Sequence, residues 1–346
     1  MAERVLTTRE LNRAVLARQH LLEPSRGSIV KTLQAIGGIQ AQYAPSMYVG
    51  LWSRMRDLER DALTRALEQR TVIQATLMRV TIHLVAKRDY WPFALATRAA
   101  RRELWIRAMR KGATHAELEG LAERLREHLD EHGQISRKEL DTLVGKPHAI
   151  GVGLWIDLVR VPPSGTWERR RADLFAAAED WIGAPPEMSA EQAAAQLVRS
   201  YLAGFGPASR ADIASYTGLP RREIAPALEH LKLRTLRSED GEELLDLPRA
   251  PLPDPEQPTG VRFLPTWDST LLVHVRRARI LPEEHRAKIF HVRNPHSDAV
   301  FLVDGAVAGT WRYEDGQIVL SPFAPLAAAD EAALRDEAGR LAAFHA

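Results

Sequence analysis

Cysteine is absent from this chain of 346 residues, so the protein can form no disulfide and has no thiolate nucleophile or metal ligand. No apolar run approaches the roughly 18 residues that a membrane-spanning helix requires. The first residues also lack the apolar stretch of a secretory signal peptide. These absences predict a cytoplasmic protein with no membrane partner.

Several signatures of catalysis and cofactor binding are also missing. The sequence contains neither a phosphate-binding loop nor a nucleophile elbow. His291, His296 and Asp298 lie close together, but no second close-spaced ligand pair follows them, so scattered histidines are the simpler interpretation. We therefore expect no metal ion and no cofactor.

The charge is nearly balanced but unevenly placed. A formal net charge of +2 accompanies a charged fraction of 27% and a hydrophobic fraction of 45%, which is typical of a globular protein of two to four domains. Lysine is scarce beside arginine, and arginines cluster near residues 98–102, 169–171 and 276–279. Arginine suits phosphates and guanine edges, although a GC-rich genome would also favour it.

The first third of the chain has the pattern of a winged helix. Thr7 and Glu10 have the spacing of a capping box at a helix start. A helix is predicted over residues 28–36, followed by helices near 47–52 and 59–68. Two β-branched runs, 71–78 and 81–86, then predict a β-hairpin. Helices followed by a hairpin are the order of a winged helix.

This order recurs twice. After a long helix at 88–111, helices at 116–132, after Ser136 and at 153–158 precede two strands within 159–174 and a helix at 175–182. In the third pass, a helix at 190–203 precedes a helix capped by Ser209, a helix after Pro220, and strands at 233–237 and 243–246. The segments HGQISRKEL and FGPASRADI occupy equivalent positions in the second and third repeats. Repetition of a DNA-binding unit favours a function in nucleic-acid binding, although winged helices also mediate protein contacts.

A proline-rich linker at 248–260 separates these repeats from a strand-rich end. We expect this end to be a small antiparallel sheet or barrel closed by a helix at 329–344. Its predicted strands are 261–264, 271–275, 288–292, 299–303, 306–313 and 317–320.

Two glutamines stand just after the helix that Gly37 and Gly38 should terminate. Gln40 and Gln42 are two residues apart, so in an extended segment both amides would face one pocket, whereas in a helix they would diverge. Two surface glutamines at a helix end are the alternative interpretation of this motif by itself.

Five segments occur in this order along the chain: GGIQAQY, LMRVTIHLV, FGPASRADIASYTGL, FLPTWDSTLLVHVRR and FLVDGAVAGTWR. Together they resemble the bacterial winged-helix DNA glycosylases of the AlkZ/YcaQ type. The resemblance runs from about Leu11 to the C-terminal helix. In the fourth segment many members of the family have the sequence HADR, whereas this chain has His274-Val275-Arg276-Arg277. This difference weakens the case for a functional role of that turn.

The resemblance implies an α+β, mainly helical fold of three tandem winged helices and a C-terminal antiparallel β-barrel, arranged as a C-shaped clamp. The corresponding domains would be 1–110, 111–187, 188–250 and 260–346. It implies a monomer that removes N7-alkylated purines from double-stranded DNA, including bulky natural-product adducts and, in some members, interstrand crosslinks. The family's catalytic motif, Gln-x-Gln or His-x-Gln, matches Gln40 and Gln42.

Six further residues are candidate DNA contacts. Arg79 and His83 lie on the first hairpin and could contact the lesion strand; a surface arginine and a half-buried histidine are the alternative. The candidate phosphate contacts are Arg169, Arg170, Arg276 and Arg277. The rival functions are a non-catalytic winged-helix regulator, which would be a dimer that reads a palindrome, and a protein-interaction module.

Overall fold

The computed structural model describes residues 4–109, 112–275, 278–291 and 296–346. Within these ranges the chain combines helices with several β-sheets, as the expected mixed α+β class requires. No helix among the described residues is long and apolar enough to cross a membrane.

The first unit has the order helix–strand–helix–helix–strand–strand. Ser28 caps its first helix by accepting a hydrogen bond from the backbone N–H of Lys31, and Gly37 ends that helix in the left-handed conformation. β4 lies between β2 and β3 in an antiparallel arrangement. The elements are α2 (Ile29–Ile36), β2 (Ile39–Gln40), α3 (Ala44–Trp52), α4 (Arg60–Glu68), β3 (Val72–Thr76) and β4 (Ile82–Ala86).

The same order recurs in the second unit, with two differences from the prediction. Residues 153–158 do not form a full helix: Val152–Leu154 make one 3-10 turn that follows Gly151 and contains Gly153, and Leu158 begins a strand. Phe175 belongs to a strand because it pairs with Ile135. The elements are α6 (His115–His132), β5 (Ile135–Ser136), α7 (Arg137–Val144), β6 (Leu158–Arg160), β7 (Leu174–Ala177) and α8 (Ala178–Ile182).

The third unit repeats the order once more. Ser209 and Asp212 form a capping box, Gly218 ends the helix in the left-handed conformation, and Pro220 precedes the next helix, as predicted. Ala208 bridges Leu245 in place of the first strand. The elements are α9 (Ala190–Phe205), α10 (Arg210–Thr217), α11 (Arg221–Glu229), β8 (Arg234–Ser238) and β9 (Glu243–Asp246).

The N-terminal segment and one long helix tie the units together. α1 (Thr8–Arg18) starts at the predicted capping box of Thr7 and Glu10. β1 (Val5–Leu6) adds to the third unit by parallel pairing with β8. α5 (Lys87–Ala108) packs along α9. In the six-stranded sheet β2-β4-β3-β6-β7-β5, β3 pairs with β6, so the first two units share one sheet.

The C-terminal region is an open sheet and not the barrel that the resemblance implied. Four antiparallel strands take the order β10-β13-β14-β15, and within the described ranges no pairing joins β10 to β15. The strand expected at 271–275 is wrong, because the backbone N–H of Val275 donates to Asp212 of the third unit and not to a neighbouring strand. The elements are β10 (Val261–Leu264), β11 (Phe290–His291), β12 (His296–Ser297), β13 (Val300–Val303), β14 (Ala306–Glu314), β15 (Gln317–Pro322) and α13 (Ala328–His345).

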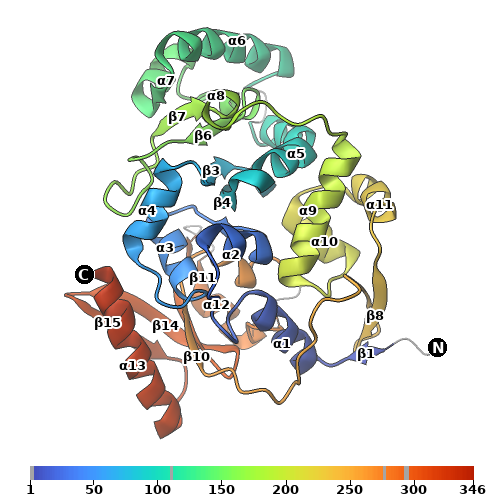
Figure 1. The fold of residues 1–346 in the computed structure, drawn as a ribbon, viewed down its shortest axis with the longest axis vertical. Coiled ribbons are helices and arrows are strands. Elements are labelled where there is room, and N and C mark those ends of the chain that lie inside the picture. Colours follow the sequence, from blue (N-terminus) through green and yellow to red (C-terminus); the bar gives the residue numbers. More distant parts are fainter. Residues whose placement is uncertain (1–3, 110–111, 276–277, 292–295) are drawn as a thin grey trace.

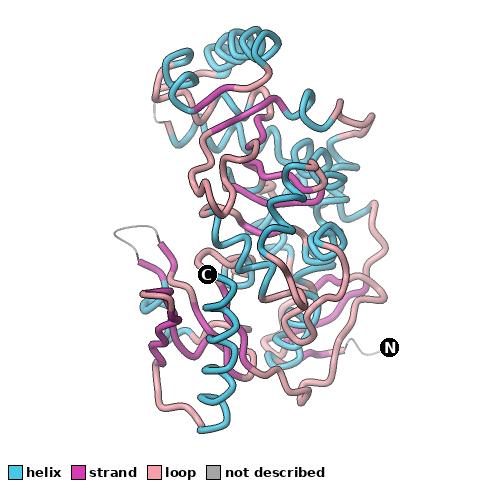
Figure 2. Tube along the Cα trace, turned by 60° about the vertical axis from the view of Figure 1, so that its left-hand side comes forward, coloured by secondary structure: helices cyan, strands magenta, loops and turns pink. Residues whose placement is uncertain are grey.

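The hydrophobic cores run across these units. One core joins β3, β4 and α5 to α9, α10 and α11; another joins α2, α3 and α4 to the C-terminal sheet and α13. Figure 1 shows this arrangement, with α6 and α7 at one end, α13 at the other, and α2 and β4 between them. In Figure 2 α13 lies along the C-terminal sheet. The segment after α2 therefore lies where three parts of the chain meet.

Replacing Gly38 with alanine is expected to lower the free energy of unfolding by at least about 2 kcal/mol. Gly38 has φ +86°, and a Cβ would lie 2.9 Å from Val85 Cγ1 and 3.0 Å from Leu84 O. The matched control is Gly316→Ala, which has φ +80° but open space around it, and should cost about 1 kcal/mol. Denaturant unfolding measures both; an equal loss for the two variants would contradict the close packing at Gly38.

Candidate functional site

Gln40 lies at the end of β2 and is 5% exposed. Its Oε1 accepts a hydrogen bond from Nη2 of Arg79 at 3.3 Å. Its direct cross-strand neighbour on β4 is His83. The extended conformation predicted for this position is therefore present, and it directs a neutral amide toward the turn between β3 and β4.

Gln42 is exposed, two residues further along the chain. Its Oε1 accepts a hydrogen bond from the backbone N–H of Ile82 at 3.1 Å. Gln40 and Gln42 thus both contact residues 79–82 of the first hairpin, although β2 itself covers only Ile39–Gln40. One amide is nearly enclosed and the other is accessible, a combination that suits a site in which one side chain meets a ligand and the other supports it.

The turn that meets these amides has an unusual backbone. Arg79 and Val80 have φ of +55° and +59°, a conformation that is uncommon for residues with a Cβ and costly for a β-branched one. The Arg79 guanidinium donates to the carbonyl of Tyr216 and lies 5.3 Å from that ring's centroid. Burial lowers the pKa of Arg79, but an arginine remains charged. The third unit therefore holds Arg79 against Gln40.

His83 is fully buried, so in this conformation it does not expose its ring to a DNA strand, the contact expected for it. Its Nδ1 lies 3.0 Å from the carbonyl of Thr81, and its Nε2 has no hydrogen-bond partner among the described residues. Burial, followed by the charge of Arg79, lowers the pKa of His83 to about 3. The imidazole is therefore neutral at physiological pH.

The free energy of unfolding is expected to fall as the pH is lowered from 6.5 toward 5. Because the folded-state pKa of His83 lies below the unfolded value of 6.5, only the unfolded chain takes up this proton over that range. His83 alone should account for about 2 kcal/mol at pH 5. Denaturant unfolding at pH 5, 6 and 7 measures this dependence. The free energy of unfolding should depend less steeply on pH in His83→Gln than in the control His132→Gln, which alters an exposed histidine. Equal slopes would contradict a neutral buried His83.

Arg170 lies beside the glutamines, although it comes from the second unit. It is exposed on the loop between β6 and β7, and its Nη1 donates to the hydroxyl of Tyr43 at 3.2 Å. Tyr43 follows Gln42 directly and is 43% exposed. Arg169 is also exposed on this loop. Of the predicted contacts, Arg79 bonds to Gln40 and Arg170 bonds to the residue after Gln42, whereas Arg276 and Arg277 lie outside the described residues.

One buried polar residue of this region was missed from the sequence. Gln74 of β3 is 2% exposed, and its Nε2 donates to the carbonyl of Ala41, between the two glutamines, at 3.3 Å. Gly165, in the loop that carries Arg170, approaches the Gln74 side chain so closely that a Cβ there would lie 2.5 Å from Oε1. The signal that the sequence offered for Gln74 was a polar amide side chain inside a strand rich in β-branched residues.

The side chain of His274 is enclosed and bonded within the protein. His274 is 5% exposed, and its Nε2 lies 3.1 Å from both the carbonyl of Phe205 and Nη1 of Arg279. Burial, followed by the charge of Arg279, lowers the pKa of His274 to about 3. These contacts connect the C-terminal region to the end of α9 and place the imidazole in the interior.

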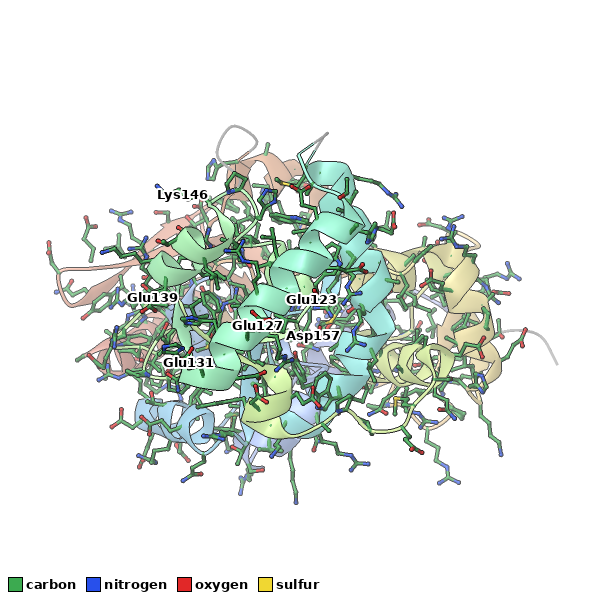
Figure 3. The ribbon with its side chains drawn as sticks, turned by 90° about the horizontal axis from the view of Figure 1, so that it is seen from above. Glu123, Glu127, Glu131, Glu139, Lys146 and Asp157 are labelled. Carbon is green, nitrogen blue, oxygen red and sulfur yellow. The ribbon has the colours of Figure 1, made fainter. Side chains whose placement is uncertain are left out.

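The face of the molecule formed by α6 is anionic. Figure 3 looks onto this face, where Glu123, Glu127 and Glu131 follow one another along α6, and Asp157 lies beyond the helix. The four-residue spacing puts the three glutamates on one side of the helix. Among the described residues no group of three histidine, aspartate or glutamate side chains is placed to hold a metal ion.

The sequence profile described as "DNA glycosylase AlkZ-like" matches residues 33–344, most of the chain. The chain belongs to the AlkZ-like DNA glycosylase family. The structure is also similar to that of the DNA glycosylase AlkZ of Streptomyces sahachiroi, with a TM-score of 0.80, 20% sequence identity, and coverage of 99% of this chain and 97% of that one. At this identity the likeness establishes the fold. A search among proteins of curated function finds no match.

Membership of this family confirms the resemblance on which the sequence interpretation depended. The AlkZ-like chain is a DNA glycosylase, a protein of DNA repair whose substrate is DNA. Gln40, Gln42 and their partners Arg79, His83 and Tyr43 all lie within the matched range.

Proposed function

We propose that this protein hydrolyses the N-glycosidic bond of N7-alkylated purines in double-stranded DNA, and that Gln40 and Gln42 form its active site. The observation that carries the proposal is the pair of neutral amides held by Arg79 and by the Ile82 N–H on one turn. Bulky natural-product adducts and interstrand crosslinks are included in the proposed substrate range.

The chemistry fits the residues present. Alkylation at N7 makes the purine cationic, so the base leaves without strong general acid catalysis. The remaining task is to hold a water molecule near C1′ of the sugar and to stabilise positive charge that develops there. A glutamine carbonyl accepts a hydrogen bond from water and presents a negative dipole, which is positioning and electrostatic catalysis. Gln42 is exposed and would hold the water; Gln40 would orient water and sugar.

We propose further that the three repeated units are winged helices, with boundaries near 1–110, 111–187 and 188–250, which together with residues 260–346 form a monomeric clamp on DNA. Two observations support this. Each unit has a similar order of helices and strands, with a 3-10 turn for one helix in the second unit and a bridge for the first strand in the third. In the first two units the last strand lies between the other two. A single chain with three such units needs no dimer partner to span a duplex.

Replacing Arg170 with alanine is expected to weaken binding to duplex DNA of any sequence and to reduce the slope of log K against log salt concentration by about 1. Arg170 is exposed beside Tyr43 and carries its charge next to the proposed active site. The matched control is Arg335→Ala on α13, whose side chain is 68% exposed. Binding titrations at several salt concentrations measure the slope; an unchanged slope in Arg170→Ala would remove this residue from the DNA contacts.

The function is tested by incubating the wild type with three duplexes of one sequence, which carry an N7-methylguanine, a bulky N7-guanine adduct or no damage. The proposal expects abasic sites at the alkylated positions only. Binding to a fixed operator sequence that is tighter than binding to alkylated DNA, with no base release, would instead show a winged-helix regulator. DNA binding that barely depends on salt would favour a protein-interaction module.

A further inference from the structure

Gln40 and His83 are neighbours on one face of the six-stranded sheet. They pair directly across β2 and β4. The backbone N–H of Ala41 donates to the carbonyl of Ile82 at 2.7 Å, which makes the adjacent Gln40–His83 pair a non-hydrogen-bonded one. In such a pair the two Cα atoms are about 4.5 Å apart and the side chains are at their closest. The imidazole therefore stands beside the amide of the proposed active site.

The tautomer of His83 follows from its one hydrogen bond. The carbonyl of Thr81 can only accept, so Nδ1, 3.0 Å away, carries the hydrogen. Nε2 of the neutral ring then has a lone pair and is an acceptor. This atom is buried, and no residue in the described part of the chain bonds to it. A buried acceptor left unsatisfied is costly, so its retention needs an explanation.

Arg79 supplies the opposite chemistry to the same amide. A guanidinium has donors only, and its Nη2 already bonds Oε1 of Gln40 at 3.3 Å. The amide of a glutamine can be turned over with little change in shape, so its orientation is fixed only by its partners. A donor near one amide atom and an acceptor near the other would allow only one orientation of the amide group.

We propose that His83 is a positioning residue for this reaction: its Nε2 accepts a hydrogen bond from the Nε2 amino group of Gln40, while Arg79 donates to Oε1. The bond forms when the Gln40 side chain turns about its terminal torsion, whose energy profile is broad. The second lone pair of Oε1 is then held in one direction, available to the water or the sugar. This inference rests on the function proposed above, and it deepens the role of Gln40.

A neutral acceptor suits the substrate class. A charged imidazole at this place would oppose the positive charge of the alkylated purine and of the developing sugar cation. Burial and Arg79 keep His83 neutral, so it orients the amide without adding a positive charge. Arg79 is held to the backbone of Tyr216, which fixes the donor side of the arrangement.

The inference is tested with two substitutions at His83 that separate the acceptor from the volume. His83→Gln keeps an acceptor at similar reach, and His83→Leu is apolar. The single-turnover rate of base release from an N7-methylguanine duplex should fall about tenfold or more in His83→Leu, with the Kd for DNA unchanged, because one orienting hydrogen bond is lost. His83→Gln should retain most of the rate. In a Gln40→Ala background, His83→Leu should cause no further loss.

Three results would overturn the inference. One is an equal effect of His83→Leu in the wild type and in Gln40→Ala, because His83 would then act independently of Gln40. Another is a His83→Gln variant no more active than His83→Leu. The third comes from the folded wild type: the ¹⁵N resonance of His83 Nε2 in the DNA complex should differ between wild type and Gln40→Ala, and identical resonances would contradict the bond. An inactive wild type would overturn the proposed function as well, whereas the first two results leave it standing.

Discussion

Gln42→Ala is expected to lower the single-turnover rate of base release by at least about 100-fold, the usual cost of removing one preorganised group from a charge-stabilising site. Gln42 is exposed, and its Oε1 is directed by the Ile82 N–H, so alanine removes the proposed water ligand without opening a core. The Kd for DNA should change little, because a neutral amide contributes little to phosphate binding.

Gln40→Ala is expected to lower the rate of base release by a similar factor. The double variant should be only slightly slower than either single variant. The two amides bond to one turn and serve one water and one sugar, so their effects should not add. The matched control is Gln69→Ala, which removes an exposed glutamine at the end of α4. Rates are measured with enzyme in excess over a duplex that carries one N7-methylguanine. A full rate in Gln42→Ala would move the chemistry to other residues.

Asp268→Ala is expected to lower the free energy of unfolding by about 3–5 kcal/mol. Asp268 accepts two hydrogen bonds from Arg54, at 2.8 and 2.9 Å, and both side chains are 1% exposed. Alanine would leave the Arg54 guanidinium charged and unpaired in the interior. The pair joins the end of α3 to the segment after β10, so its loss should also loosen the C-terminal region from the first unit.

Denaturant unfolding measures this loss, and Glu314→Ala is its control. Glu314 and Arg312 also form an ion pair, at 2.9 Å, but both side chains are more than half exposed, so its removal should cost less than about 0.5 kcal/mol. Equal small losses for the two variants would contradict a structural role of the buried pair.

The sequence predicted those features that depend on neighbouring residues. The capping boxes at Thr7 and Ser209 and the helix end at Gly37 are confirmed, because each depends on a side chain or a backbone conformation within one helical turn. The order of elements in the three units followed from the same local patterns.

Features that depend on distant partners could not be predicted in the same way. β2 and β5 are two residues long and exist only because β4 and β7 pair with them. The strand expected at 271–275 was wrong because its backbone bonds to Asp212, 63 residues away along the chain. Likewise, the pattern of the C-terminal strands fits either an antiparallel sheet or a barrel, because pattern alone does not decide whether the two edge strands pair.

The same division applies to the candidate site. The two glutamines were found from their spacing and from a family resemblance, and the first hairpin was placed near them by sequence order. The contact of Arg79 with Tyr216, 137 residues further along the chain, depends on packing of the third unit against the hairpin. The complete burial of His83 likewise depends on the tertiary packing of the chain. No local pattern contains that information.

The central claim is tested most directly by base release and DNA binding measured on the same samples, with the wild type and the Gln40→Ala/Gln42→Ala double variant on one N7-methylguanine duplex. We expect abasic product from the wild type, at least a 100-fold slower rate from the double variant, and equal binding by both. Equal rates, or a wild type that binds this duplex and releases no base, would contradict the claim.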